Sequence, residues 1–200
     1  MRRVPATSKI LDVGCGNNSP FYIKSNFPEF HYTGIDIGNY NQTKPLLADE
    51  YILTDSLGFA DAISRHQNKF DAVISSHNLE HCEDRWATLQ AMLSAVKPGG
   101  GMIFLAFPSE KSIEFPNRSR TLNYFDDLTH RGNPPDFDMV LSLIEDNGFS
   151  IDYSVRMYRP MVLRLLGFFQ EPFARRKNII LQGTWSYYGF ESIIWAKKNF

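Results

Sequence analysis

The stretch that most constrains the fold is residues 9–20, KILDVGCGNNSP. Its start, residues 10–13, is mainly apolar and is typical of a buried strand. Gly14 and Gly16 follow, and glycine permits backbone angles and a close ligand approach that a side chain would prevent. Residues 17–20 suit a turn and the start of a helix. This order predicts a small-molecule cradle at the carboxyl end of a parallel strand.

Two carboxylates are placed to serve that cradle. Asp12 interrupts the first apolar run, and a carboxylate there is costly to bury unless it is paired, so we expect it to accept hydrogen bonds from a loop or a ligand. Asp36 lies 22 residues after Gly14, at the end of a second expected strand over 31–37. An acidic residue at this spacing is typical of ribose binding. The alternative is a solvated aspartate at a strand end.

Composition limits the class of protein. The 200 residues are 43% hydrophobic and carry a formal net charge of −1, which favours one globular domain and gives no general field for nucleic acid. The two cysteines, Cys15 and Cys82, have no metal-like spacing, so we assign no metal ligand and expect a reduced, cytoplasmic compartment. We find no secretory signal and no apolar run long enough to span a bilayer.

Strand-like and helix-like segments alternate up to residue 108, which predicts a parallel α/β arrangement. Residues 109–135 break this rhythm, and a long irregular stretch with interspersed aromatic residues indicates a functional insert. A helix over 136–147, a half-buried edge strand over 149–157 and a final strand over 185–197 follow. We expect no helix between these two strands, and therefore an antiparallel closing pair.

Five segments resemble, in order, the motifs of class I S-adenosylmethionine-dependent methyltransferases: ILDVGCG, GID, ILTDS, FDAVISSHNLEH and VKPGGGMIFLAFP. The resemblance covers residues 9–108 and is closest to the small type 11/23-like branch. It implies a Rossmann-like, doubly wound sheet of seven strands in the order 3-2-1-4-5-7-6, with strand 7 antiparallel. The single domain, residues 1–200, would then comprise a cofactor half (1–108), an acceptor-side insert (109–135) and a C-terminal helix and strand pair (136–200).

The resemblance also implies S-adenosylmethionine as the cofactor and a set of residues that surround it. Asp36 would bind the ribose, with Ile37 against the adenine. Cys15 also has a structural alternative, and Asp55 the alternative of capping the next helix. The other implied residues border the methionine part, the adenine or the methyl exit: Asp12, Gly14, Gly16, Ser56, Ser76 and His77.

Methyl transfer from a sulfonium is an in-line displacement that needs mainly alignment, and a general base only where the acceptor loses a proton. Our catalytic candidates are His130, Asp127 and His81, with His77 and Asp126 as weaker bases. His130 comes first because it lies in the insert, in FDDLTHRG, which resembles a segment of methyltransferases from envelope-glycan clusters. The alternative for His130 is a histidine that only ties the insert down, and the alternative for His81 is a structural tie near the start of the next helix.

The acceptor is expected to be a small molecule or a glycan-type compound, and nucleic acid is not expected. Arg118, Arg120 and Arg131 suit an anionic acceptor, because the guanidinium fork matches carboxylate and phosphate; a solvated loop is the alternative. The basic, apolar stretch 156–177 has three interpretations: it lies on an anionic membrane, covers the acceptor pocket, or packs on the sheet or a second subunit. We favour the last two, and the oligomeric state stays open.

Two other functions are considered. A methyltransferase-like binding module without turnover would keep the fold, but the intact glycine turn favours an enzyme. A nicotinamide-dependent oxidoreductase would need a third glycine for close packing of helix on strand, and Ser19 stands at that position.

Overall fold

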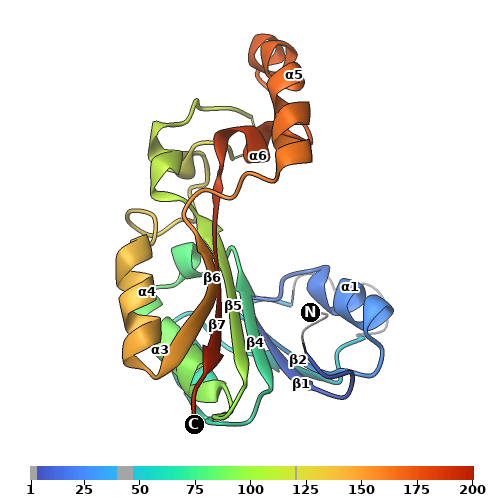
Figure 1. Cartoon of the computed structure of the whole chain (residues 1–200), viewed down its shortest axis with the longest axis vertical. Coiled ribbons are helices and arrows are strands. Elements are labelled where there is room, and N and C mark those ends of the chain that lie inside the picture. Colours follow the sequence, from blue (N-terminus) through green and yellow to red (C-terminus); the bar gives the residue numbers. More distant parts are fainter. Residues whose placement is uncertain (1–3, 40–46, 120) are drawn as a thin grey trace.

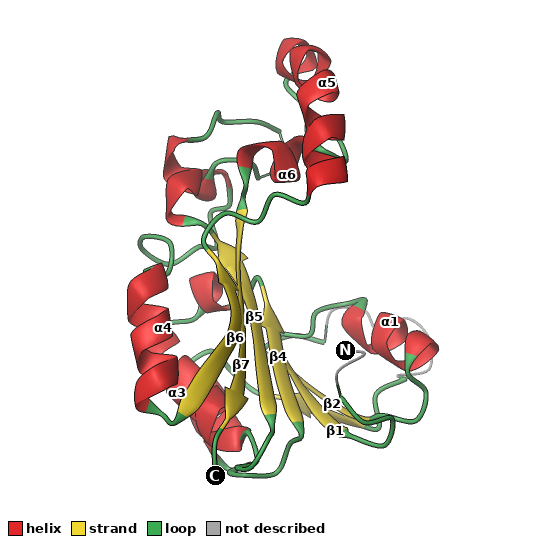
Figure 2. Ribbon diagram, viewed as in Figure 1, coloured by secondary structure: helices red, strands yellow, loops and turns green. Residues whose placement is uncertain are grey.

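The computed structural model describes residues 4–39, 47–119 and 121–200. Its centre is a seven-stranded sheet in the order β3-β2-β1-β4-β5-β7-β6 (Figure 2). The first five strands pair in parallel, and β7 is antiparallel to both of its neighbours. The predicted fold class and strand order are therefore confirmed. The strands are β1 (Lys9–Val13), β2 (His31–Asp36), β3 (Glu50–Leu53), β4 (Ala72–Ser76), β5 (Met102–Pro108), β6 (Phe149–Val155) and β7 (Glu191–Lys198).

Six α-helices and three short 3₁₀ helices are seen in these ranges. Two of the α-helices begin at side chains that cap them: Asp84 accepts from the amides of Trp86 and Ala87, and Asp136 accepts from that of Met139. The α-helices are α1 (Ser19–Asn26), α2 (Phe59–Ser64), α3 (Arg85–Ala95), α4 (Phe137–Asp146), α5 (Met161–Lys177) and α6 (Thr184–Tyr188). The 3₁₀ helices are η1 (Leu79–His81), η2 (Glu110–Glu114) and η3 (Tyr124–Asp126).

The sheet is covered on both faces, which explains why its central strands are apolar on both sides. Alternate residues of a strand point to opposite faces, so Leu11 and Ile10 of β1 belong to different hydrophobic clusters. The larger cluster includes Leu89 of α3 and Ile144 of α4. The smaller one includes Ile23 of α1. Figure 1 shows α3 and α4 on one side of the sheet and α1 on the other.

The C-terminal part corrects two of our expectations. The expected strand over 185–197 starts only at Glu191, because Thr184–Tyr188 form α6 and Gly189, at φ 74°, ends that helix. Two helices, α5 and α6, separate the last two strands, where we expected none. The antiparallel pairing itself is correct, and β6 is the edge strand as predicted.

Helix α5 takes up most of the basic, apolar stretch 156–177. It packs against α6, away from the sheet (Figure 1), so packing on the sheet is not what the structure shows. Its Gly167 meets Gly183 backbone to backbone, at a distance that leaves no room for a side chain on either residue. Six large apolar side chains of α5 are more than half exposed, among them Met161 and Phe169. None of the helices in the described ranges has both the length and the apolar character to cross a membrane.

Candidate functional site

A cavity of about 640 Å³ opens at the carboxyl ends of the first four strands. This volume lies within the range of about 300–1,000 Å³ that is usual for small-molecule sites. Its walls come from the loops after these strands and from the insert. The lining residues are Gly14, Gly16, Asp36, Ile37, Ser56, Phe59, His77, Asn78, His81, Cys82, Glu83, Leu128, Thr129 and Arg131.

Two features that lie far apart in the sequence meet at the floor of the cavity. The amide of Gly16 donates to Oδ2 of Asp36 at 2.7 Å, and the amide of Ile37 donates to Oδ1 of the same carboxylate at 2.7 Å. Gly16 has φ 56°, a conformation that favours glycine. Two main-chain donors therefore fix the orientation of the carboxylate that the sequence assigns to a ribose.

Gly14 is held closely between two loops. Its amide donates to the carbonyl of Ile35 at 2.9 Å, and its φ is 72°. A Cβ at this position would overlap the side chain of Asn78, which follows β4. The absence of a side chain at Gly14 thus lets the loops after β1 and β4 form one continuous wall.

Asp12 lies beneath the glycine turn and does not line the cavity. The hydroxyl of Tyr32 donates to its Oδ2 at 2.6 Å, and both residues are buried. Burial is the main reason why the pKa of Asp12 rises to about 6, and the bonds from Tyr32 and Ser19 oppose this rise only in part. The predicted need for a partner is met by a tyrosine of β2, although we expected a loop or a ligand.

Three other residues of the predicted cofactor set also lie outside the cavity lining. Cys15 is buried, and burial raises the pKa of its thiol to about 12, which agrees with the structural alternative. Asp55 accepts from the amide of Gly58 at 2.6 Å, just before α2, although the helix cap itself is Gly58. Ser76 ends β4 opposite Ala106.

His77 joins the cavity wall to the end of the sheet. Its Nδ1 lies 3.2 Å from Oε1 of Glu80, and its Nε2 lies 3.1 Å from Oε1 of Glu191. Burial alone would lower its pKa, but the two carboxylates outweigh this and raise the pKa to about 9. The imidazole is therefore a cation near neutral pH, which makes it unsuited to accept a proton. Its φ of 52° is unusual for a residue with a side chain.

The structure brings the three predicted catalytic residues together beside the cavity. The rings of His81 and His130 have centroids 4.8 Å apart. Thr129 connects His81 to Asp127, because its Oγ1 lies 2.9 Å from Nδ1 of His81 and donates to Oδ1 of Asp127 at 2.6 Å. These bonds outweigh burial and lower the pKa of Asp127 below its ordinary value.

His130 is nearly buried behind this wall, with 7% of its side chain exposed. Its Nδ1 lies 2.6 Å from the carbonyl oxygen of Tyr124, and its ring stacks on that of Tyr124 at 4.2 Å. His130 thus ties the insert together through Tyr124, as the structural alternative proposed. Burial lowers the pKa of His130 below its ordinary value, so its ring is neutral near pH 7.

Asp126, the weaker base candidate, has a structural position instead. Its carboxylate accepts from the amides of Arg118, Leu122 and Asn123, at distances of 2.9–3.2 Å. Together with a bond of 2.8 Å from the side-chain amide of Asn117, these bonds outweigh burial and lower the pKa of Asp126. Asp126 therefore organises the insert.

The arginines of the insert differ in their surroundings. Arg118 is buried and makes a two-pronged ion pair with Glu171 of α5, so it is neither solvated nor available to a ligand. Arg131 lines the cavity and pairs with Glu83 at 2.7 Å. Arg120 lies outside the described residues.

Sequence reasoning missed several residues of the site. Glu80 has no role of its own in the sequence analysis, where it is only part of the motif FDAVISSHNLEH, yet it is fully buried between His77 and the histidine cluster. Thr129 and Leu128 are exposed at the rim, and Glu191 comes from β7. The TH pair in FDDLTHRG was the only signal for Thr129, whereas nothing local in the sequence indicates Glu191.

Comparison with known proteins gives a family match. Residues 2–153 match a family model described as a methyltransferase domain. Phosphoethanolamine N-methyltransferase 1 of Arabidopsis thaliana is 31% identical over 124 residues, which are 58% of this chain and 25% of that protein. The 27-O-demethylrifamycin SV methyltransferase of Amycolatopsis mediterranei is 29% identical over 123 residues, 54% of this chain and 43% of that protein. The chain thus spans less than half the length of these curated relatives.

Solved structures share the fold at low identity. A SAM-dependent methyltransferase from Archaeoglobus fulgidus superposes with a TM-score of 0.59 at 18% identity. The match covers 95% of this chain and 86% of that protein's chain. Phosphoethanolamine N-methyltransferase 2 of Haemonchus contortus, in complex with S-adenosyl-L-methionine, has a TM-score of 0.63 at 15% identity. This match covers 96% of the present chain and 49% of the Haemonchus contortus chain.

Proposed function

This chain belongs to the methyltransferase-domain family, in its class I, S-adenosylmethionine-dependent branch, and from that premise we propose that it transfers the methyl group of this cofactor to a small-molecule or glycan-type acceptor. We treat residues 1–200 as one such domain, with the cofactor half, insert and C-terminal part divided as above.

The observation that carries the proposal is the carboxylate of Asp36, held by the amides of Gly16 and Ile37 at the floor of the cavity. A carboxylate oriented in this way presents its remaining lone pairs to two neighbouring hydroxyls, as a ribose provides. Six residues of the predicted cofactor set line the same cavity: Gly14, Gly16, Asp36, Ile37, Ser56 and His77. We propose that Asp12 and Cys15 support the turn from behind.

We place the acceptor at the other end of the cavity, beside His81, Asp127 and His130. Leu128, 96% exposed, and Arg131 form the rim there and offer one apolar and one cationic contact. In the transfer, the methyl carbon leaves the sulfonium, the electron pair of the C–S bond stays on sulfur, and a bond to the acceptor forms. Two of the relatives are named for small-molecule acceptors, phosphoethanolamine and 27-O-demethylrifamycin SV, which supports this acceptor class.

Ligand-induced stabilisation tests the cofactor assignment. A ligand at 100 times its dissociation constant adds about 2.7 kcal/mol of stability. We expect S-adenosylmethionine and S-adenosylhomocysteine to raise the melting temperature and NAD to leave it unchanged. Stabilisation by NAD alone, or by none of the three, would contradict the proposal.

Turnover separates an enzyme from a binding module. Formation of S-adenosylhomocysteine is followed by mass spectrometry with a panel of hydroxyl and amino compounds and glycans. Cofactor binding without turnover on any of them favours the binding module. Once an acceptor is known, unchanged rates in His130→Ala and Asp127→Asn would remove these residues from catalysis.

A further inference from the structure

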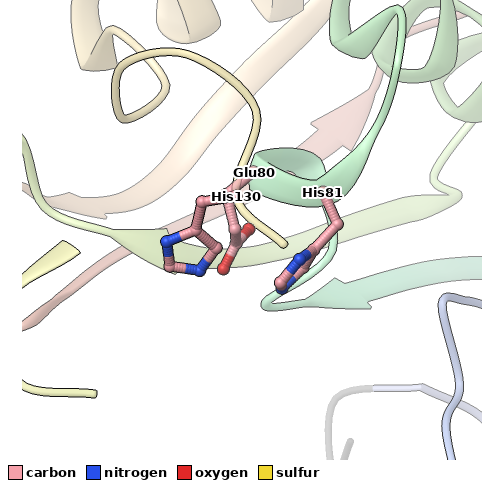
Figure 3. Close-up of side chains that lie close together, drawn as sticks. All are labelled: Glu80, His81 and His130. Carbon is pink, nitrogen blue, oxygen red and sulfur yellow. The ribbon is translucent and has the colours of Figure 1, made fainter. Parts of the chain in front are cut away.

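We propose that Glu80, His81 and His130 bind one divalent first-row transition metal ion at the acceptor end of the cavity. The sequence assigned no metal ligand, because the residues come from two separate segments: η1 and the insert 109–135. The structure brings one ligand atom of each residue within 4.8 Å of the other two. Figure 3 shows the carboxylate of Glu80 between the two imidazole rings.

The first support is an unpaired oxygen of Glu80. This residue is fully buried, and its Oε1 forms a hydrogen bond with Nδ1 of His77 at 3.2 Å. Its Oε2 is also buried and has no hydrogen-bond partner among the described residues. A buried carboxylate oxygen without a partner is costly, and a bound cation would remove that cost.

The second support is the orientation of the two imidazoles. His130 donates Nδ1–H to the carbonyl oxygen of Tyr124. His81 donates Nδ1–H to Oγ1 of Thr129, because the single hydroxyl hydrogen of Thr129 already points to Asp127. Because Nδ1 of each ring is used in this way, Nε2 is the nitrogen of each ring that is left to bind an ion. Metal-binding histidines are commonly held in this way, with the other nitrogen donating to a carbonyl or a carboxylate-linked group.

The donor set indicates the class of ion. Two imidazole nitrogens and one carboxylate oxygen suit Zn²⁺, Mn²⁺, Fe²⁺ or Co²⁺ better than Mg²⁺ or Ca²⁺, which prefer oxygen ligands. Bonds of about 2.1 Å at tetrahedral angles place two ligand atoms on one ion about 3.4 Å apart. Binding therefore draws the ligand atoms, which now lie within 4.8 Å of one another, together by up to about 1.4 Å. Partly exposed His81 allows this by side-chain rotation.

Three protein ligands leave a coordination position open, and the cavity lies next to His81. This step rests on the proposed function: the open position takes the oxygen of an acceptor hydroxyl and lowers its pKa. The hydroxyl proton passes to water, the oxygen–carbon bond forms, and the C–S bond breaks with its electron pair on sulfur. The acceptor class is then a compound with a free hydroxyl group.

Metal binding is tested on the full chain after treatment with a chelator. Zn²⁺ is titrated by calorimetry and Co²⁺ by its visible absorption, with Mg²⁺ as the comparison ion. We expect one ion per chain and at least a tenfold loss of affinity in each of His81→Asn and His130→Asn. His31→Asn is the matched control, because His31 is exposed at the start of β2, and it should leave the affinity unchanged.

Two results would overturn the site: no saturation at one equivalent, or equal affinity in the original chain, His81→Asn and His130→Asn, which indicates an adventitious ion only. His81 is partly exposed, so its variant is expected to fold, and circular dichroism checks this. Binding of S-adenosylhomocysteine is measured on the same samples. Cofactor binding without metal binding removes the metal site alone, and metal binding without cofactor binding removes the proposed function alone.

Discussion

The backbone amide of Gly16 and the carboxylate of Asp36 are joined by a 2.7 Å hydrogen bond across 20 positions of sequence. The bond runs from the loop after β1 to the end of the adjacent parallel strand β2. The glycine turn and the acidic residue therefore form one structural unit, and a change in either alters the same part of the cavity.

We predict that Asp36→Asn weakens the binding of S-adenosylhomocysteine by about 10- to 150-fold, because a hydrogen bond to a charged group contributes about 1.5–3 kcal/mol. Calorimetry measures the dissociation constant. Asp61→Asn is the control, since Asp61 is exposed in the first turn of α2 and should bind like the original chain. Equal affinities for all three proteins would remove Asp36 from the site.

We predict that Gly14→Ala lowers the free energy of unfolding more than Gly132→Ala does. Both glycines have positive φ, 72° and 63°, so both alanines carry a backbone cost of about 1–2 kcal/mol. Only at Gly14 would the new methyl group overlap a side chain, that of Asn78, which adds about 1–3 kcal/mol. Urea unfolding of the two variants measures the difference. Equal losses would show that Asn78 moves aside freely.

Asp12 predicts a specific dependence of stability on pH. Its pKa is about 6 in the folded chain, whereas the ordinary pKa of an aspartate, which we take for the unfolded chain, is 3.8. Between these values the folded chain holds a proton that the unfolded chain releases. The contribution of Asp12 is therefore most favourable below about pH 4 and falls by about 3 kcal/mol as the pH rises to 6 and above.

Asp12→Asn should remove this dependence, because an amide does not titrate and can still accept from Tyr32. We expect the variant to gain stability relative to the original chain between pH 4 and pH 8, measured by urea unfolding at each pH. Asp61→Asn serves again as the control. A constant difference between Asp12→Asn and the original chain across this range would contradict the assigned pKa.

The ion pair of Arg118 and Glu171 links the insert to α5. Their side chains are 2% and 12% exposed, and Tyr188 also donates to Glu171 at 2.6 Å. We predict that Glu171→Gln destabilises the chain by about 3–5 kcal/mol, since it leaves a buried guanidinium without its counter-ion. In the exposed pair of Lys111 and Glu114, Glu114→Gln should cost about 0–1 kcal/mol. Similar losses in chemical unfolding would contradict the prediction.

The cofactor half was predictable because its signals are local. The strand at residues 9–13, the glycine turn and the spacing to Asp36 lie within one βαβ unit, where the periodic pattern and the turn residues specify the same structure. The sheet order came from the family resemblance. The structure confirms that order, including the antiparallel closing strand.

The C-terminal part was predicted less well because its residues suit more than one element. The run WSYYGFESIIW is aromatic and β-branched, which favours a strand, but its first residues form α6 until Gly189 ends the helix. The packing of α6 on α5 favours the helix over the strand in this run. The close approach of Gly167 and Gly183 cannot be predicted from either segment alone.

The histidine cluster could not be assembled from sequence for a related reason. His81 and His130 are 49 positions apart, and the insert that carries His130 has no periodic pattern that would fix its path. Its course is set by Asp126, which gathers three backbone amides, and by the ion pair of Arg118. Such contacts become visible only when the chain is folded.

The position of β7 has a consequence for the order of events during biosynthesis. This strand follows all the others in the chain, yet it lies between β5 and β6, and its first residue, Glu191, holds His77. Until residues 191–198 leave the ribosome, β5 offers an unpaired edge to any neighbouring nascent chain. A chain that ends before residue 191 would therefore be prone to aggregate, and its His77 would lack one of its two carboxylates.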